Sequence, residues 1–253
     1  MSIKFEHTEV VGWEAAIRGM RNPMNNWEKR DSFLCREGNM ACSDDCPYKY
    51  EENCPISDDE DFYVIGPNDL DLMKRLVKAG TDHRKFMRMI TVYVDITAPL
   101  YWWKEFDTYK IGTVANSCST MHKIADKEFT LEDFSTEHLY SDELEFFKEL
   151  IDCLNGVREL YLESKKKEDW WQMIQLLPSS YNQKRTIMMN YEVLANIYKS
   201  RRSHKLDEWA ERDPMVIGID TDEGSWSFMS FCDWIKTLPY SEIITQEEAL
   251  QAV

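Results

Sequence analysis

The chain has 253 residues, of which 43% are hydrophobic and 13% aromatic, so it can bury a substantial core and is unlike a disordered sequence. Its net charge of −16 argues against binding to duplex nucleic acid, because such binding needs Lys and Arg to neutralise phosphates. No basic segment followed by an apolar run opens the chain, and no stretch approaches about 18 uncharged apolar residues. We therefore expect a cytoplasmic protein with no membrane partner.

The N-terminal quarter divides into a structured start and a Cys-rich segment. Residues 3–11 predict an edge strand and residues 13–20 a short helix, whereas residues 21–62 are polar, broken by prolines and predicted to be a long loop or insertion. Four thiols fall in that segment, at Cys35, Cys42, Cys46 and Cys54. Four thiolates suit a closed, structural zinc site, with an iron–sulfur cluster or unliganded thiols as the alternatives.

The remaining chain alternates helical and strand-like patterns. Asn68 with Asp71 resembles a capping box, which predicts a helix over residues 69–79 with Asn68 as its N-cap. Residues 90–96 are β-branched and aromatic and predict a strand, after which Pro99 leads into a helix over residues 100–109. Apolar residues at helical spacing predict three more helices, over residues 141–164, 186–200 and 227–237.

The stretch from His83 to His122 resembles the core of the flavin-dependent thymidylate synthases. In that family a strand leads to a helix ending in Gln-x-x-Arg-His-Arg, soon followed by Ser-x-Asn-Glu-x-Ser-x-Arg-Tyr. Here the helix end carries Glu105 and then Thr108-Tyr109-Lys110, and the second motif matches residues 113–122 with one residue inserted. A Leu-Pro pair at Leu177, and Asn190 opening a helix that ends in two arginines, echo a second family segment. The resemblance spans about residues 69–211.

The resemblance implies a single domain over residues 1–253 with an α+β fold, namely a mixed sheet flanked by helices and a Cys-rich insertion near the N-terminus. It further implies a homo-oligomer, a tetramer in the family, with sites shared between subunits. The implied ligands are a pyrimidine nucleotide and FAD, and the implied reaction is methyl or one-carbon transfer to a deoxyuridylate-like substrate.

Candidate site residues follow from the resemblance and from side-chain chemistry. Small donors beside aromatic rings suit a nucleotide, His can carry protons near neutral pH, and an Arg fork suits a phosphate. The expected catalytic residues are Ser119, His122 and Glu105, the cofactor-binding residues are His83, Lys110, Asn190 and Arg201, and the substrate-binding residues are Tyr109, Thr113, Asn116, Ser117 and Arg202.

Each of these residues also has a structural interpretation. The small polar residues could form a solvated turn, the histidines could be structural, and the arginines near residue 201 could complement a helix dipole. Arginines of the family motifs are replaced at Lys110, Met121 and near Ile174. The alternative function is therefore a catalytically inactive nucleotide-binding or protein-interaction module with a zinc-stapled Cys loop.

Overall fold

The computed structural model describes residues 3–35, 62–212 and 229–246. Strands in this part of the chain are β1 (Lys4–Val11), β2 (Phe33–Cys35), β3 (Phe62–Val64), β4 (Thr91–Pro99), β5 (Val114–Ser117) and β6 (Asn182–Asn190). The α-helices are α1 (Trp13–Arg21), α2 (Pro67–Lys78), α3 (Leu100–Phe106), α4 (Thr120–Lys123), α5 (Ser141–Ser164), α6 (Lys167–Leu176), α7 (Tyr191–Arg201), α8 (Phe231–Thr237) and α9 (Glu242–Thr245). Short 3-10 turns lie at Asn22–Met24, Trp27–Lys29, Lys85–Arg88 and Leu131–Asp133.

The central sheet has four strands in the order β1-β4-β6-β5, and β2 pairs with β3 in a separate two-stranded ribbon. Every neighbouring pair is antiparallel, so the described sheet is not the mixed one predicted from the sequence. The central pair is antiparallel because β6 runs in the opposite direction along the whole of β4, from Thr91 opposite Asn190 to Pro99 opposite Asn182. The α+β class is confirmed.

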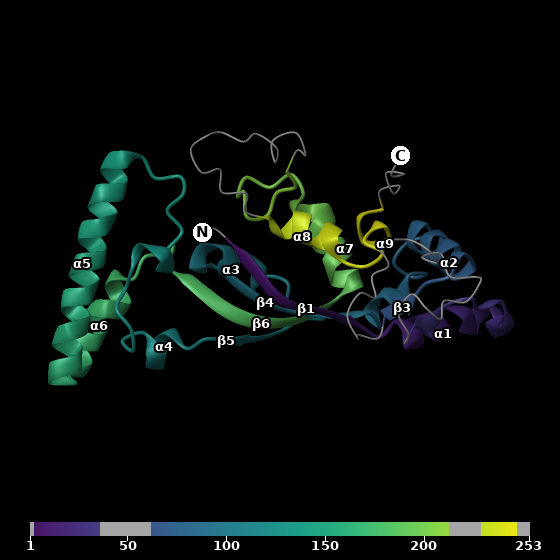
Figure 1. Ribbon diagram of the computed structural model, residues 1–253, viewed down its shortest axis with the longest axis horizontal. Helices are drawn as coiled ribbons and strands as arrows, with labels where there is room; N and C mark the ends of the chain where they lie inside the picture. The colour runs from purple at the N-terminus through teal and green to yellow at the C-terminus, as the bar shows by residue number, and fades with distance from the viewer. Residues whose placement is uncertain (1–2, 36–61, 213–228, 247–253) are drawn as a thin grey trace.

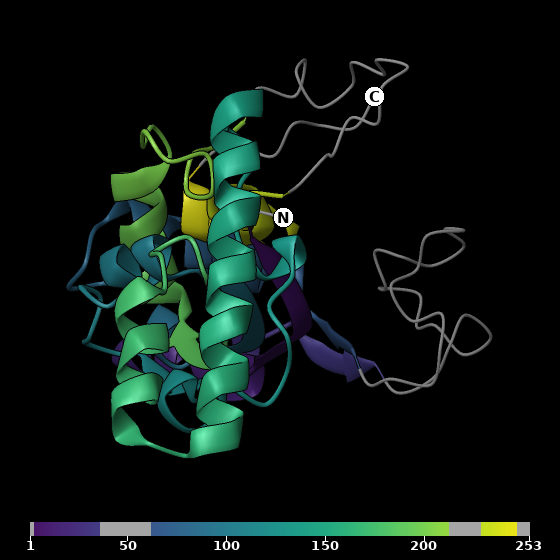
Figure 2. The ribbon, with the colours of Figure 1, turned by 90° about the vertical axis from the view of Figure 1, so that its left-hand side faces the viewer.

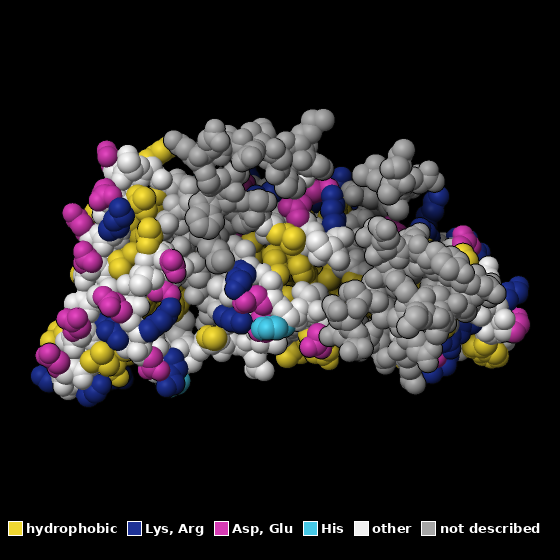
Figure 3. Space-filling view, in the orientation of Figure 1, with side chains coloured by type: hydrophobic (Ala, Val, Ile, Leu, Met, Phe, Trp, Pro, Cys, Tyr) yellow, Lys and Arg dark blue, Asp and Glu magenta, His cyan; other side chains and the backbone are white. Residues whose placement is uncertain are grey.

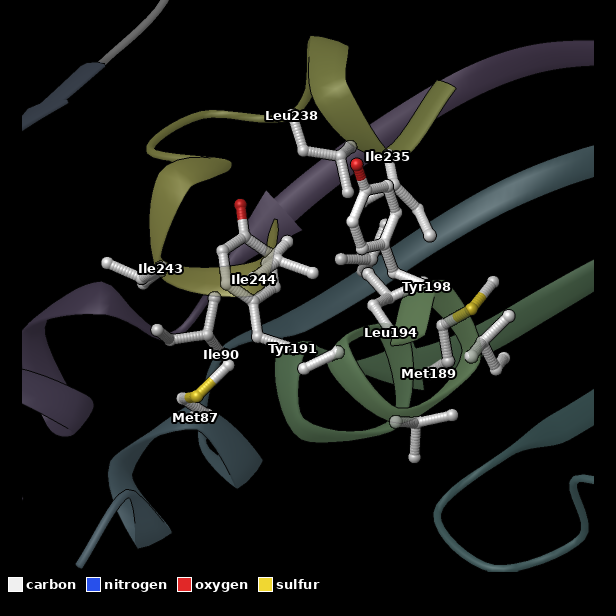
Figure 4. Close-up of a cluster of buried hydrophobic side chains, with 14 of the residues drawn as sticks. Met87, Ile90, Met189, Tyr191, Leu194, Tyr198, Ile235, Leu238, Ile243 and Ile244 are labelled. Atoms are coloured by element: carbon white, nitrogen blue, oxygen red, sulfur yellow. The ribbon is translucent and has the colours of Figure 1, made fainter. Parts of the chain in front are cut away.

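Helices cover one face of this sheet. Inward side chains of β4 alternate with outward ones, so that Val92, Val94 and Ile96 are buried while Tyr93 between them is 42% exposed. Helices α3, α7 and α8 lie on the covered side (Figure 1). Figure 4 shows Leu194 and Tyr198 of α7 and Ile235 of α8 in one hydrophobic cluster. These buried side chains pack α7 into the core that covers the sheet.

The expected helix over residues 186–200 is wrong in its first third, residues 186–190. Residues 182–190 form strand β6, with Ile187 and Met189 buried and Thr186 and Met188 turned outward, a two-residue alternation. The helix begins at Tyr191 because the Asn190 side chain accepts a hydrogen bond from the Val193 N–H at 3.0 Å. The family resemblance, which has Asn190 opening a helix, located this start correctly.

The predicted loop over residues 21–62 contains ordered structure in the part that is described. Arg21 and Asp69 form a buried ion pair at 2.7 Å. Strand β2 pairs with strand β3 in an antiparallel ribbon. Helix α2 begins at Pro67 after Gly66, so Asn68 is not its N-cap. The Asp31 carboxylate caps it instead, because it accepts hydrogen bonds from the N–H groups of Asn68 at 2.7 Å and Asp69 at 3.0 Å.

Helix α5 has the bounds that the sequence predicts, Ser141–Ser164, and it forms an antiparallel hairpin with α6 (Figure 2). The hairpin lies at one end of the molecule and has its own hydrophobic cluster around Phe134, Leu154 and Met173. The last predicted helix is shorter than expected, because α8 begins at Phe231 after a capping box from Ser230 to Asp233. No helix in the described ranges is long and apolar enough to cross a membrane.

Candidate functional site

The first part of the candidate site is the end of helix α3. Pro99 precedes the helix, and Trp102, Trp103 and Phe106 are buried at helical spacing, which leaves Glu105 on the partly exposed side. Beyond the helix the chain turns through Tyr109 and then through residue 112. Gly112 has a φ of +80°, and a Cβ there would lie 3.0 Å from Val193 and 3.2 Å from the amide nitrogen of Asn190. The turn therefore packs closely against the start of α7.

The second part is the other end of helix α7. Arg201 is the last residue of this helix, and its side chain is only 15% exposed. The guanidinium group does not bond to the carbonyl groups that end its own helix; it points across to α3. Complementing the helix dipole therefore does not by itself account for this orientation.

Five residues, which we call the Arg201 cluster, meet at this point: Glu105, Tyr109, Arg201, His204 and Trp209. Arg201 donates from Nε to the Tyr109 hydroxyl at 2.8 Å and from Nη2 to Glu105 Oε2 at 3.0 Å. Its Nη1 lies 2.8 Å from Nε2 of His204. The guanidinium carbon also lies 5.2 Å from the centre of the buried Trp209 ring, within the range of a cation–π contact.

The environment shifts the pKa values of Arg201 and His204 in opposite directions. Burial by itself would lower the pKa of Arg201, but its bonds to Tyr109 and Glu105 raise that pKa above the ordinary value, so the cation is secured. Burial, and then the charge of Arg201, lower the pKa of His204 below its ordinary 6.5, although Glu105 and Glu208 oppose this. At neutral pH the cluster therefore holds a fixed cation beside an uncharged imidazole.

Two other predicted residues support the cluster, and three lie elsewhere. Thr113 donates its hydroxyl hydrogen to the Tyr109 carbonyl, and Asn190 caps α7. Lys110 is exposed between Tyr109 and Gly112. Arg202 lies 3.9 Å from Glu211 and over the Tyr198 ring. His83 is exposed in the turn after α2. His83 precedes Arg84, which pairs with Glu192 in the first turn of α7, about 14 Å from Arg201 along the helix.

The remaining predicted residues form a second group on β5 and α4. Asn116 lies opposite Thr186, on the sheet face that the helices leave open, whereas Ser117 lies opposite Arg185 on the other face. Ser119 caps α4 by accepting a hydrogen bond from the His122 N–H at 3.0 Å. Within the described residues, no hydrogen bond or ion pair joins this group to the Arg201 cluster.

His122 borders a surface hollow of about 330 Å³ between α4 and the α5–α6 hairpin. Its walls are Met121, His122, Tyr161, Lys165, Lys167 and Trp170. The Trp170 indole donates to the Met121 carbonyl at 3.2 Å, which ties α4 to α6. Figure 3 shows Lys, Arg, Asp and Glu side chains beside hydrophobic ones at this end of the molecule. Of the second group, His122 therefore borders a hollow that two lysines and two aromatic side chains help to line.

The resemblance assigns flavin binding to the family's Arg-His-Arg triplet, which corresponds here to Thr108-Tyr109-Lys110, and these three residues do not fit that role. The Thr108 hydroxyl donates to the Glu105 carbonyl at 2.7 Å, and the Tyr109 hydroxyl accepts from Arg201. Lys110 is the one charged side chain of the three, whereas flavin dinucleotide carries two phosphates that need donors. Thr108, Tyr109 and Lys110 therefore do not supply the donors that a flavin diphosphate needs.

The zinc prediction falls mostly outside the described residues. Cys35 lies in β2 and is partly buried, but Cys42, Cys46 and Cys54 belong to the part that is not described. Among the residues that are, no group of three or more His, Cys, Asp or Glu side chains could hold a metal ion. The four-thiolate site stays a prediction.

Two members of the cluster were missed from the sequence. His204 follows Arg201 by three residues within the basic run Lys199 to Lys205, a spacing that could have associated it with Arg201. Trp209 gives no such signal, because a buried tryptophan beside a ligand has the same sequence pattern as one in the core.

Comparison with known proteins gives a likeness at the level of the fold. No family model and no curated protein matches the sequence. A crystal structure of thymidylate synthase X from Helicobacter pylori with FAD and dUMP is similar at a TM-score of 0.55 and 15% identity, covering 96% of this chain and 95% of that one. Another, of the flavin-dependent thymidylate synthase ThyX from Helicobacter pylori complexed with FAD and dUMP, has a TM-score of 0.50 and 17% identity, covering 81% and 86%. The chain therefore has a divergent ThyX-like fold.

Proposed function

We propose that the protein binds a pyrimidine nucleotide and that the Arg201 cluster holds its phosphate. One observation carries the proposal. Glu105 and Tyr109 come from one segment that resembles the family and Arg201 from another, and the fold brings the three into direct contact. The similar solved structures contain dUMP, which makes that nucleotide the first ligand to test.

The chemistry of the cluster supports an anionic ligand. Arg201 is charged at every accessible pH, and its planar fork of donors matches the oxygens of a phosphate. Glu105 neutralises part of this charge in the free protein, at 3.0 Å. The nucleotide must therefore compete with Glu105 for Arg201.

Calorimetric titration with dUMP and with deoxyuridine tests the phosphate assignment. Charge-assisted hydrogen bonds contribute about 1.5–3 kcal/mol each, so dUMP should bind at least about tenfold more tightly than the nucleoside. Deoxyuridine is the matched control because it differs only by the phosphate. Equal affinities would show that no phosphate site exists, and heat from neither ligand would reject the nucleotide proposal itself.

We further propose that a second copy of the chain completes the site. The predicted residues separate into the Arg201 cluster and the group at Asn116, Ser117, Ser119 and His122, which do not contact each other within one chain. Closed symmetric oligomers place such separate surfaces of identical chains together, and the resemblance implies sites shared between subunits. A single-chain mass in light scattering, at concentrations where dUMP binds, would exclude this arrangement.

The alternative is that the fold persists as a binding or interaction module without catalysis. The engaged side chains of Thr108 and Tyr109 favour this alternative, because they leave the flavin positions with one cation. Base modification by methyl or one-carbon transfer needs the cofactor. Uptake of FAD by the purified protein, seen as visible absorption, would support the catalytic reading, whereas dUMP binding without FAD uptake supports the module.

A further inference from the structure

The imidazole of His204 lies between two hydrogen-bond donors. Its Nε2 is 2.8 Å from Nη1 of Arg201, and its Nδ1 is 3.1 Å from the backbone nitrogen of Leu206. A guanidinium nitrogen and a backbone amide both carry hydrogens and have no lone pair to offer. Both ring nitrogens of His204 therefore face groups that can only donate.

A neutral imidazole cannot satisfy both neighbours. It has one N–H and one lone pair, so if Nδ1 accepts from Leu206, the Nε2–H points at the hydrogens of Arg201. The opposite tautomer leaves the Leu206 N–H facing an Nδ1–H instead. Either way two donors converge without an acceptor between them. The indole nitrogen of Trp209 is likewise buried without an acceptor among the described residues.

We propose that an anionic phosphate oxygen accepts hydrogen bonds from Arg201 Nη1 and His204 Nε2 together, which makes His204 a ligand-binding residue. This inference rests on the proposed nucleotide site and identifies a second residue that contacts the phosphate. Two donors 2.8 Å apart can share one oxygen at ordinary hydrogen-bond lengths. With Nε2–H directed to the phosphate, Nδ1 keeps its lone pair for Leu206, so the donor conflict is removed.

The clamp formed by Arg201 Nη1 and His204 Nε2 uses the neutral imidazole, which has a hydrogen on Nε2 and a lone pair on Nδ1. Arg201, Glu105 and Glu208 are the charged groups that act on His204. Burial and then Arg201 prevail over the two carboxylates and lower the pKa of His204 below its ordinary 6.5, so the ring is neutral in the free protein at neutral pH. A hydrogen on Nδ1 would meet the Leu206 N–H, so His204 should donate to the phosphate without taking up a proton.

Two substitutions separate the two ring nitrogens. In His204→Asn the amide oxygen can still accept from Leu206, but nothing replaces Nε2, so dUMP affinity should fall about tenfold. In His204→Gln an amide donor can take the place of Nε2–H, so affinity should be partly retained. Between about pH 8 and about pH 7 the ratio of wild-type to His204→Gln affinity should stay within about threefold, because neither side chain takes up a proton. Any change in the ionisation of dUMP with pH affects both proteins equally, so it cancels in that ratio.

The His204 imidazole can be followed directly by NMR in the full-length protein, with His204→Asn used to assign its signal. Adding dUMP or inorganic phosphate should shift the Nε2 signal of this ring, with the hydrogen held on Nε2, whereas deoxyuridine should not. If dUMP binds and its affinity is unchanged in His204→Asn, the clamp is refuted while the nucleotide site stands. If phosphate shifts the His204 signal but dUMP does not bind, the clamp stands and the nucleotide proposal fails. A shift produced by deoxyuridine would assign the donors to the base and overturn the phosphate assignment.

Discussion

Replacing Arg21 with leucine is expected to lower the free energy of unfolding by about 3–5 kcal/mol, because it leaves a buried carboxylate without its cation. The side chains of Arg21 and Asp69 are 3% and 0% exposed, and Nε and Oδ1 are 2.7 Å apart. Asp69 also accepts hydrogen bonds from the N–H of Ser32 at 3.0 Å and from its hydroxyl at 2.6 Å. Loss of Arg21 would therefore loosen the contact between α1, α2 and the segment before β2.

Urea unfolding measures this loss, with Arg18→Leu as the matched control one turn earlier on the same helix. Arg18 is exposed, so its replacement should change stability by no more than about 0.5 kcal/mol. Burial would raise the pKa of Asp69, but Ser32 and Arg21 lower it below the ordinary 3.8. A carboxyl with a depressed pKa stabilises the fold above its ordinary value, and this contribution is lost as the pH falls through the lower folded value. Equal effects of Arg21→Leu and Arg18→Leu would show that the buried ion pair does not stabilise the fold.

Replacing Arg201 with glutamine is expected to weaken dUMP binding by about 2–3 kcal/mol, or about 30- to 150-fold. The substitution removes the cation and the planar fork that face Glu105 and Tyr109. Binding to the neutral nucleoside should change much less, because deoxyuridine lacks the phosphate that Arg201 holds.

Arg202→Gln is the matched control, because it removes the same charge one residue further along. Arg202 is exposed, lies near Glu211 and does not join the cluster, so its replacement should alter dUMP affinity less than about threefold. Comparable losses in both variants would mean that only the long-range charge of the basic run attracts the nucleotide. Thermal melting of each variant checks that folding is retained.

The elements that were predicted best have a clear apolar spacing within their own sequence. Helix α5 repeats its apolar spacing over many turns, and its bounds were predicted to the residue. Strand β6 was missed because Ile187 also fits a helical face; it is the pairing with β4 that selects the strand. The cap of α2 comes from Asp31, far away in sequence, so inspecting the helix and its flanks could not reveal it.

The same distinction applies to the site. The resemblance identified Glu105, Tyr109 and Arg201 as candidate site residues. Their side chains do contact each other, because the fold brings together the two segments that carry them. It could not show that Asn116 lies on the opposite face of the sheet, since that depends on the register of β5 against β6. Nor could it show the donor conflict at His204, which exists only where Arg201 and the Leu206 amide approach one ring.

A crystal structure of the protein with dUMP tests whether the Arg201 cluster binds the phosphate of a nucleotide. We expect the phosphate in hydrogen-bond contact with Arg201 and His204 of one subunit, and Ser119 or Asn116 of a neighbouring subunit facing the same nucleotide. A nucleotide bound in the hollow at Lys165 and Trp170, with the Arg201–Glu105 pair intact, would contradict this expectation.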